Sequence, residues 1–140
     1  MKQFIRFFSL LLILTALSLA IAIPLESTIS YADGWTVMDT GDLPGNLLLY
    51  STWSSSATNV YVVGYGAILH YDGNDWTLLQ SQSWLYDIWG TASNNIYAVG
   101  WNGTILHYDG ISWTNMSSGT SEDLHGIWGT ASNNIYAVGL

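Results

Sequence analysis

Short apolar runs alternate with turn-forming residues along most of the 140-residue chain. Within one representative stretch the runs occupy 85–89, 96–100, 104–108 and 113–116. Gly, Asn, Asp and Ser dominate the breaks between them, and these residues favour turns. Runs of this length between turn signals are typical of strands, and no helical periodicity follows the N-terminal apolar segment. The sequence therefore predicts an all-β fold.

A twelve-residue segment, WGTASNNIYAVG, occupies 89–100 and recurs without change at 128–139. A diverged copy runs over 53–64. We call this segment the first block. Its copies begin 36 and 39 residues apart, a period typical of solenoids and propellers.

A shorter segment, ILHYDG, alternates with the first block and is called the second block. It occupies 68–73 and 105–110, and each copy is followed three residues later by a tryptophan, Trp76 or Trp113. Between the two blocks the chain varies in length by only one or two residues. Stacked structural units tolerate such length changes in their turns while the blocks themselves stay fixed.

Each repeat contains four predicted strands, and two of them, IYAV and ILHY, are apolar on both faces. Four-stranded antiparallel units with both faces covered are blades of a β-propeller. We expect residues 33–140 to form one outer strand beginning near Trp35, two full blades and half of a third. A minimal four-bladed ring needs about sixteen strands, so further blades or self-association are expected to close it.

The segments 71–76 and 108–113, both YDG-x-x-W, resemble the Asp-box hairpins of bacterial-neuraminidase-repeat propellers. The whole repeat resembles the broad WD/YVTN/BNR-like propeller superfamily. It departs from the usual Asp box because its aspartates abut the glycine directly. Histidines also stand where that motif carries Ser or Thr.

The N-terminus has the pattern of an export signal. Lys2 and Arg6 precede the uncharged run 7–25, and Ala20-Ile21-Ala22 has the small-x-small form that signal peptidases cleave. We predict a signal peptide over residues 1–22, with cleavage as late as residue 32 as an alternative, and a secreted or cell-surface protein. The run is also just long enough to remain as a membrane anchor.

Net charge is −8, and every residue after Arg6 is neutral or acidic. A surface without Lys or Arg neither neutralises phosphates nor is drawn to anionic lipid. Nucleic acid is therefore not an expected partner, and a membrane is one only if the leader is retained. Cysteine is absent, which excludes disulfides, thiolate nucleophiles and cysteine-bound zinc.

The repeated acids are interpreted as structural. Asp72 and Asp109 stand next to Gly73 and Gly110, where a carboxylate can accept backbone N–H bonds while glycine supplies a positive φ. One carboxylate per turn falls far short of the six to eight oxygens of a calcium site. We therefore expect turn positions and no metal.

His70 and His107 hold equivalent strand positions, which favours hydrogen-bonded sheet histidines over zinc ligands. No cofactor is predicted. Sialidases of the Asp-box kind bind the substrate carboxylate with arginines, which the mature chain lacks. Glu122 and Asp123 are sequence neighbours and poorly placed to flank one bond. We expect no enzyme.

Six tryptophans fall into two equivalent sets that suit core or hairpin packing. They are Trp53, Trp89 and Trp128, and Trp35, Trp76 and Trp113. Trp84 and Trp101 stand outside both sets, and Tyr65 is the counterpart of Trp101 one repeat earlier. Strand direction places all three at turns on one face, together with Asp42, Glu122 and Asp123.

This face is the predicted ligand surface of a secreted binding or scaffolding module, with a protein or a glycan as its partner. The alternatives are a non-catalytic part of an extracellular enzyme and a lectin-like propeller. Asn102 and Asn115 each begin a glycosylation sequon.

Overall fold

The computed structural model describes residues 4–7, 35–38, 43–44 and 46–140, with side chains from Leu43 onward except at residues 45 and 80–82. The chain divides into two compact units, Met1–Gly41 and Asp42–Leu140. In the first unit β1 (Phe4–Phe7) pairs antiparallel with β2 (Trp35–Met38). A strand is present near Trp35, but it pairs with β1, which lies within the predicted leader, so its place as the outer strand of a blade stays a prediction. The apolar run after Phe7 and both predicted cleavage points lie outside the described residues.

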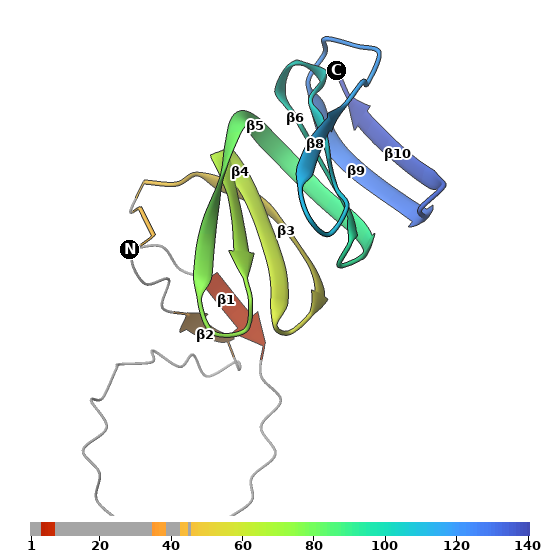
Figure 1. Ribbon diagram of the computed structural model, residues 1–140. Coiled ribbons are helices and arrows are strands. Elements are labelled where there is room, and N and C mark those ends of the chain that lie inside the picture. Colours follow the sequence, from red (N-terminus) through yellow and green to blue (C-terminus); the bar gives the residue numbers. More distant parts are fainter. Residues whose placement is uncertain (1–3, 8–34, 39–42, 45) are drawn as a thin grey trace, which may run out of the picture. The chain divides into compact units, whose positions relative to one another are not determined.

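The second unit contains, in its described part, only β-strands and one short 3-10 turn, η1 (Trp101–Gly103). Six strands form one antiparallel sheet in chain order (Figure 1). They are β3 (Leu49–Ser56), β4 (Asn59–Tyr71), β5 (Trp76–Ala92), β6 (Asn95–Gly100), β7 (Ile105–Tyr108) and β8 (Trp113–Met116). β9 (Leu124–Ala131) and β10 (Asn134–Gly139) form a separate two-stranded sheet. The predicted all-β, antiparallel character is confirmed for the described residues, and their sheets do not close into a ring.

The two long strands each serve two pairings. The first half of β4 pairs with β3 and its second half pairs with β5, while the second half of β5 pairs with β6. His70 Nε2 lies 2.7 Å from Asn59 Oδ1, and its ring stacks on Tyr61 at 4.4 Å, so the two halves of β4 lie side by side. Gly66, with φ 60°, allows this reversal. The two separate strands that the sequence predicts here are the two halves of β4, joined through a reversal at Gly66.

Identical sequence produces identical pairing. Trp89 faces Tyr97 between β5 and β6, and Trp128 faces Tyr136 between β9 and β10. The strands end at a glycine because the facing backbone is very close: a Cβ on Gly100 would overlap the carbonyl oxygen of Trp84. No side chain fits in that space.

Two hydrophobic clusters lie between successive repeats. The larger joins β4 to β5, β6 and β7 and contains Ile68, Leu85 and Ile96, which are fully buried. The smaller joins β6 to β9 through Val99, Leu124 and Ile127. The core therefore runs from repeat to repeat, which fixes each hairpin against its neighbour.

The block tryptophans pack on glycines of the following repeat. Trp53 lies against Gly90, and Trp89 lies so close to Gly129 that a Cβ added to this glycine would be 2.8 Å from the Trp89 ring. Trp128, which the sequence predicts to serve core or hairpin packing like Trp53 and Trp89, has 61% of its surface exposed and lies outside both clusters. No further described strand lies beyond β9 and β10 to cover it.

Candidate functional site

Three aromatic side chains form a continuous, half-exposed row, which we call the aromatic row: Tyr65, Trp84 and Trp101. The ring centroids of Tyr65 and Trp84 are 4.7 Å apart, and those of Trp84 and Trp101 are 6.3 Å apart. Their exposed fractions are 48%, 43% and 52%. None of the three belongs to either hydrophobic cluster.

Strand pairing brings these rings together. Tyr65 follows Gly64 at the bend of β4 and faces Trp84 directly across the pairing with β5. Trp101 follows Gly100 at the end of β6 and opens η1. Trp84 therefore contacts a ring 19 positions before it and another 17 positions after it in the sequence.

The turn after Trp101 is held by a carboxylate from the next repeat. Asn102 adopts a left-handed conformation with φ 54°, and its backbone N–H donates to Asp123 Oδ1 at 2.8 Å. The Tyr86 hydroxyl donates to Asp123 Oδ2 at 3.4 Å. Partial desolvation and the Asp123 carboxylate raise the pKa of Tyr86. Asp123 thus lies beside the aromatic row, Glu122 is exposed, and Asp42 lies outside the described residues.

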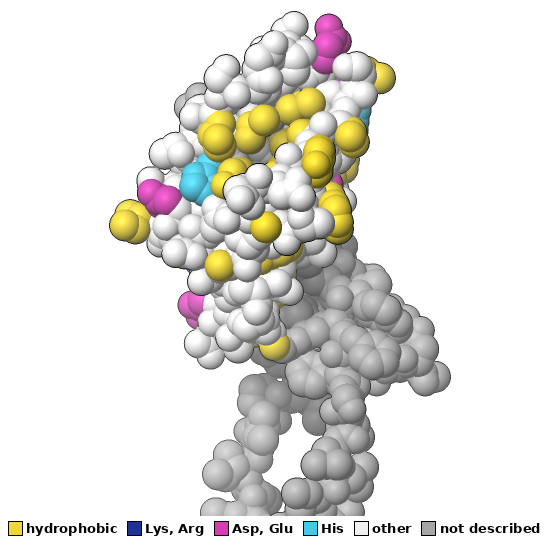
Figure 2. Space-filling view, turned by 90° about the vertical axis from the view of Figure 1, so that its right-hand side faces the viewer, with side chains coloured by type: hydrophobic (Ala, Val, Ile, Leu, Met, Phe, Trp, Pro, Cys, Tyr) yellow, Lys and Arg dark blue, Asp and Glu magenta, His cyan; other side chains and the backbone are white. Residues whose placement is uncertain are grey.

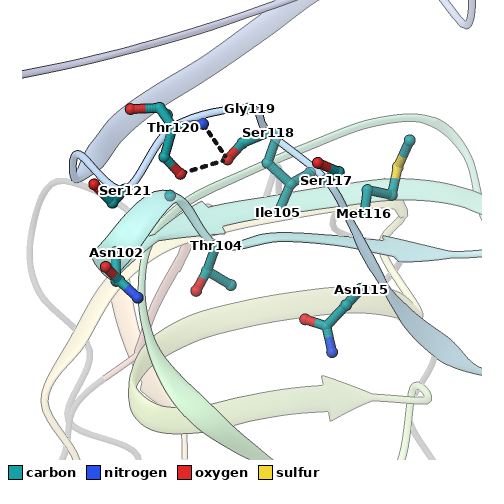
Figure 3. A pocket seen from close by; sticks show the side chains of 11 residues that line it. Asn102, Thr104, Ile105, Asn115, Met116, Ser117, Ser118, Gly119, Thr120 and Ser121 are labelled. Atoms are coloured by element: carbon teal, nitrogen blue, oxygen red, sulfur yellow. Dashed lines mark hydrogen bonds between the residues drawn. The ribbon is translucent and has the colours of Figure 1, made fainter.

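A polar hollow of about 480 Å³ begins at Asn102, the residue after Trp101 (Figure 3). Its walls are η1, the start of β7 and the connection from β8 to β9. Ser118 Oγ donates to the Thr120 carbonyl at 3.1 Å and accepts the Thr120 N–H at 3.3 Å, which gives this connection a fixed shape. Hydroxyl and amide groups dominate the lining, and both sequon asparagines, Asn102 and Asn115, contribute to it.

A second row of rings, not anticipated from the sequence, crosses the three equivalent strands β3, β5 and β9. Tyr50 lies 5.8 Å from Tyr86, and Tyr86 stacks on His125 at 4.7 Å with an interplanar angle of 19°. Each residue follows the leucine that begins its strand pairing, at Leu49, Leu85 and Leu124. The shared position after a leucine could have identified this row from the sequence, but the three residues are of two different types and do not read as a repeat.

The repeated aspartates close their own turns. Asp72 Oδ1 accepts the N–H groups of Asn74 and Asp75 at 2.8 and 2.9 Å, and Asp109 Oδ1 does the same with Ile111 and Ser112, both at 2.8 Å. These backbone bonds lower the pKa of both carboxyl groups. The adjoining Gly73 and Gly110 have φ values of 106° and 96°. One carboxylate oxygen of each aspartate is thus engaged by two backbone N–H groups of its own turn.

The two strand histidines bond to asparagines of the same repeat. His70 Nε2 pairs with Asn59 Oδ1, and His107 Nε2 pairs with Asn95 Oδ1 at 2.9 Å. Desolvation lowers the pKa of His70, although the Asp72 charge opposes this. In the part of the chain that the structure describes, no three metal-ligating side chains gather.

The residues that the structure describes form no helix of the length and hydrophobicity that crossing a bilayer requires. Comparison with known proteins adds no relative: no protein-family model, no curated protein and no solved structure matches this chain.

Proposed function

We propose that this protein is an exported, non-catalytic binding module of the β-propeller type, and that the aromatic row is its ligand surface. The observation that supports this most strongly is the contact between three half-exposed rings that take no part in the core. Aromatic rings held together at a surface without a packing role are typical of recognition sites.

Strand pairing supports the propeller part of the proposal. β3, the two halves of β4 and the first half of β5 make one four-stranded antiparallel unit. The second half of β5 makes another with β6, β7 and β8. Units of this kind stacked face to face are what the WD/YVTN/BNR-like resemblance implies, and their blade number is part of the proposal.

The lining of the polar hollow favours a glycan over a protein ligand. A sugar ring offers an apolar face that stacks on Trp or Tyr and a rim of hydroxyls that needs hydrogen-bond partners. Trp101 supplies the platform, while Asn102 and Thr104 border the hollow that starts beside it. The predicted leader, which would bring the module to the cell exterior, agrees with such a ligand.

The test is glycan-array binding by the full chain and by two variants. Replacing Trp84 and Trp101 together by alanine should leave the circular dichroism spectrum unchanged and reduce binding of any glycan hit at least about tenfold, because both stacking surfaces are lost. Trp128→Ala is the matched control, since it removes an exposed tryptophan outside the row. Equal binding by the parent and the double variant, or loss of fold in the double variant, would contradict the proposal.

A further inference from the structure

An apolar hollow of about 350 Å³ lies where β9 and β10 meet β6, β7 and β8. We call it the acceptor hollow. Its apolar lining consists of Tyr97, Ile105, Met116, Ile127, Ile135 and Ala137. Viewed from the β10 side, the molecule shows hydrophobic side chains gathered across this surface (Figure 2). Trp128, Tyr136 and Val138 are exposed to 61%, 62% and 65%.

Every one of these six lining residues has a counterpart one repeat earlier in the chain. In the same order the counterparts are Tyr61, Ile68, Leu79, Ile88, Ile96 and Ala98, and all six belong to the larger hydrophobic cluster. There they pack with three further side chains, Leu106, Tyr108 and Trp113, the last two partly buried. Tyr108 and Trp113 lie 5.7 and 6.1 Å from the Tyr61 ring. The acceptor hollow therefore has the counterparts of these six residues without counterparts of Leu106, Tyr108 and Trp113.

The edge of β10 also differs from its counterpart one repeat earlier, the edge of β6. β6 pairs with β7, so that Tyr97 faces His107 and Ala98 faces Leu106. Among the described residues β10 pairs with β9 alone. Ala98 and Val99 are fully buried, whereas their counterparts Ala137 and Val138 are exposed. An unpaired, apolar strand edge is a template for strand addition.

Asn134 at the start of β10 is oriented to bond to such a strand, as its counterpart Asn95 shows. Asn95 Nδ2 donates to Thr91 Oγ1 at 2.7 Å, which turns its Oδ1 toward His107. Asn134 makes the same 2.7 Å bond to Thr130. Its Oδ1 is thus oriented to meet a histidine at the corresponding position of an added strand.

We propose that β10 and the acceptor hollow bind an antiparallel β-hairpin of the second-block type, Ile-Leu-His-Tyr-Asp-Gly-x-x-Trp, supplied by a partner segment. The first strand of the hairpin pairs with β10, and its Leu and Tyr, with the Trp that follows, enter the acceptor hollow. The histidine of that strand bonds to Asn134, and the histidine ring stacks on Tyr136. One repeat earlier, the equivalent surface is covered by the second-block hairpin of β7 and β8. We therefore infer that the occupant of the acceptor hollow has the same residue types. The inference is independent of the aromatic row.

The probe is a fluorescently labelled synthetic peptide copying residues 103–116, titrated against the full chain and followed by anisotropy. Saturable binding is expected. Leu106→Ala, Tyr108→Ala and Trp113→Ala in the peptide should each weaken binding about tenfold or more, because each empties part of the hollow. Ile111→Ala is the matched peptide control, since Ile111 is 90% exposed at the turn, and should leave affinity unchanged.

Protein variants separate this site from the glycan surface. Ala137→Glu places a charge in the acceptor hollow at an exposed position and should abolish peptide binding with an unchanged circular dichroism spectrum. Tyr136→Ala, which removes only a surface ring, provides a second variant should the first fail to fold. The Trp84→Ala, Trp101→Ala double variant should bind the peptide normally, so loss of one function leaves the other measurable.

Absence of saturable binding overturns the proposal, as does equal affinity of a peptide lacking all three apolar side chains. A third contrary result is a chain that sediments as a dimer and remains one in excess peptide, because a second copy then occupies the surface.

Discussion

At the scale of single residues, Asp72 and Asp109 each satisfy two backbone N–H groups that their turn would otherwise leave to water. The bonds end within three residues of the accepting carboxylate, so they stabilise the turn itself and no distant contact. Gly110 at φ 96° completes the turn, since an L side chain rarely adopts that conformation. The hairpin thus depends on one carboxylate and one glycine.

Asp109→Ala should lower the melting temperature by roughly a few degrees, because two backbone donors lose their acceptor. Thermal unfolding followed by circular dichroism measures this. Glu122→Ala, which removes an exposed carboxylate that takes no part in a turn of this kind, is the control and should melt like the parent. An unchanged melting temperature accompanied by loss of calcium binding would reverse the turn assignment.

Stability should also fall with acidification in two stages. The pKa of His70 lies below its usual value of 6.5 because desolvation disfavours the charged ring, so the unfolded chain takes up a proton at higher pH than the folded one. The contribution of neutral His70 to the free energy of unfolding is fully present above pH 6.5 and is lost as the pH falls toward the lowered pKa of His70. The carboxyl groups of Asp72 and Asp109, with pKa values also lowered, add a second loss below the ordinary range of aspartate.

Melting temperatures at a series of pH values test both stages. His70→Gln keeps a hydrogen-bonding side chain beside Asn59 but cannot titrate, so it should remove the first loss and retain the second. A first loss of the same size in parent and variant would assign it to another group.

At the scale of elements, the same tryptophan of the same block has two environments. Trp89 is half-buried against Gly129 of the next repeat, and the smaller hydrophobic cluster packs around it. Trp128, at the identical block position, is exposed. Burial of a block residue is therefore determined by the neighbouring repeat and not by the block sequence.

The pair allows a controlled measurement. Trp89→Ala should destabilise the fold by up to about 3 to 5 kcal/mol, the usual cost of removing a buried tryptophan, while Trp128→Ala should change stability by less than about 1 kcal/mol. Urea unfolding monitored by circular dichroism gives both values, since the far-ultraviolet signal does not depend on one fluorophore. Similar losses in the two variants would show that Trp128 is covered in solution.

Sequence reasoning located the strands because the blocks repeat, and their turn residues mark the boundaries. It also anticipated that Tyr65, Trp84 and Trp101 share a face, since antiparallel strand direction alone determines this. It missed the continuity of β4 through Gly64 and Gly66, which depends on pairing with two different neighbours. It also missed the row formed by Tyr50, Tyr86 and His125, because packing across repeats rather than local pattern aligns those rings.

At the scale of the whole molecule, charge is divided unevenly along the chain. Both basic residues, Lys2 and Arg6, precede the uncharged run 7–25, and all ten acidic residues follow it. A positive end before an apolar segment is the pattern that directs export, and removal of that segment would leave a protein without Lys or Arg. Removal of the predicted leader can therefore be tested chemically without knowledge of the ligand.

Trypsin cleaves only after Lys or Arg, so the processed protein should resist it even when unfolded in urea, whereas the unprocessed chain can be cut only near its N-terminus. Expression with the native leader, followed by intact-mass measurement, should give a mature protein beginning at Ile23 or Asp33. The control is the same chain expressed in a cell-free system without signal peptidase, which should retain Met1. A membrane fraction that holds a product still containing Lys2 would show that the apolar run remains as an anchor, and the aromatic row would then act at the cell surface.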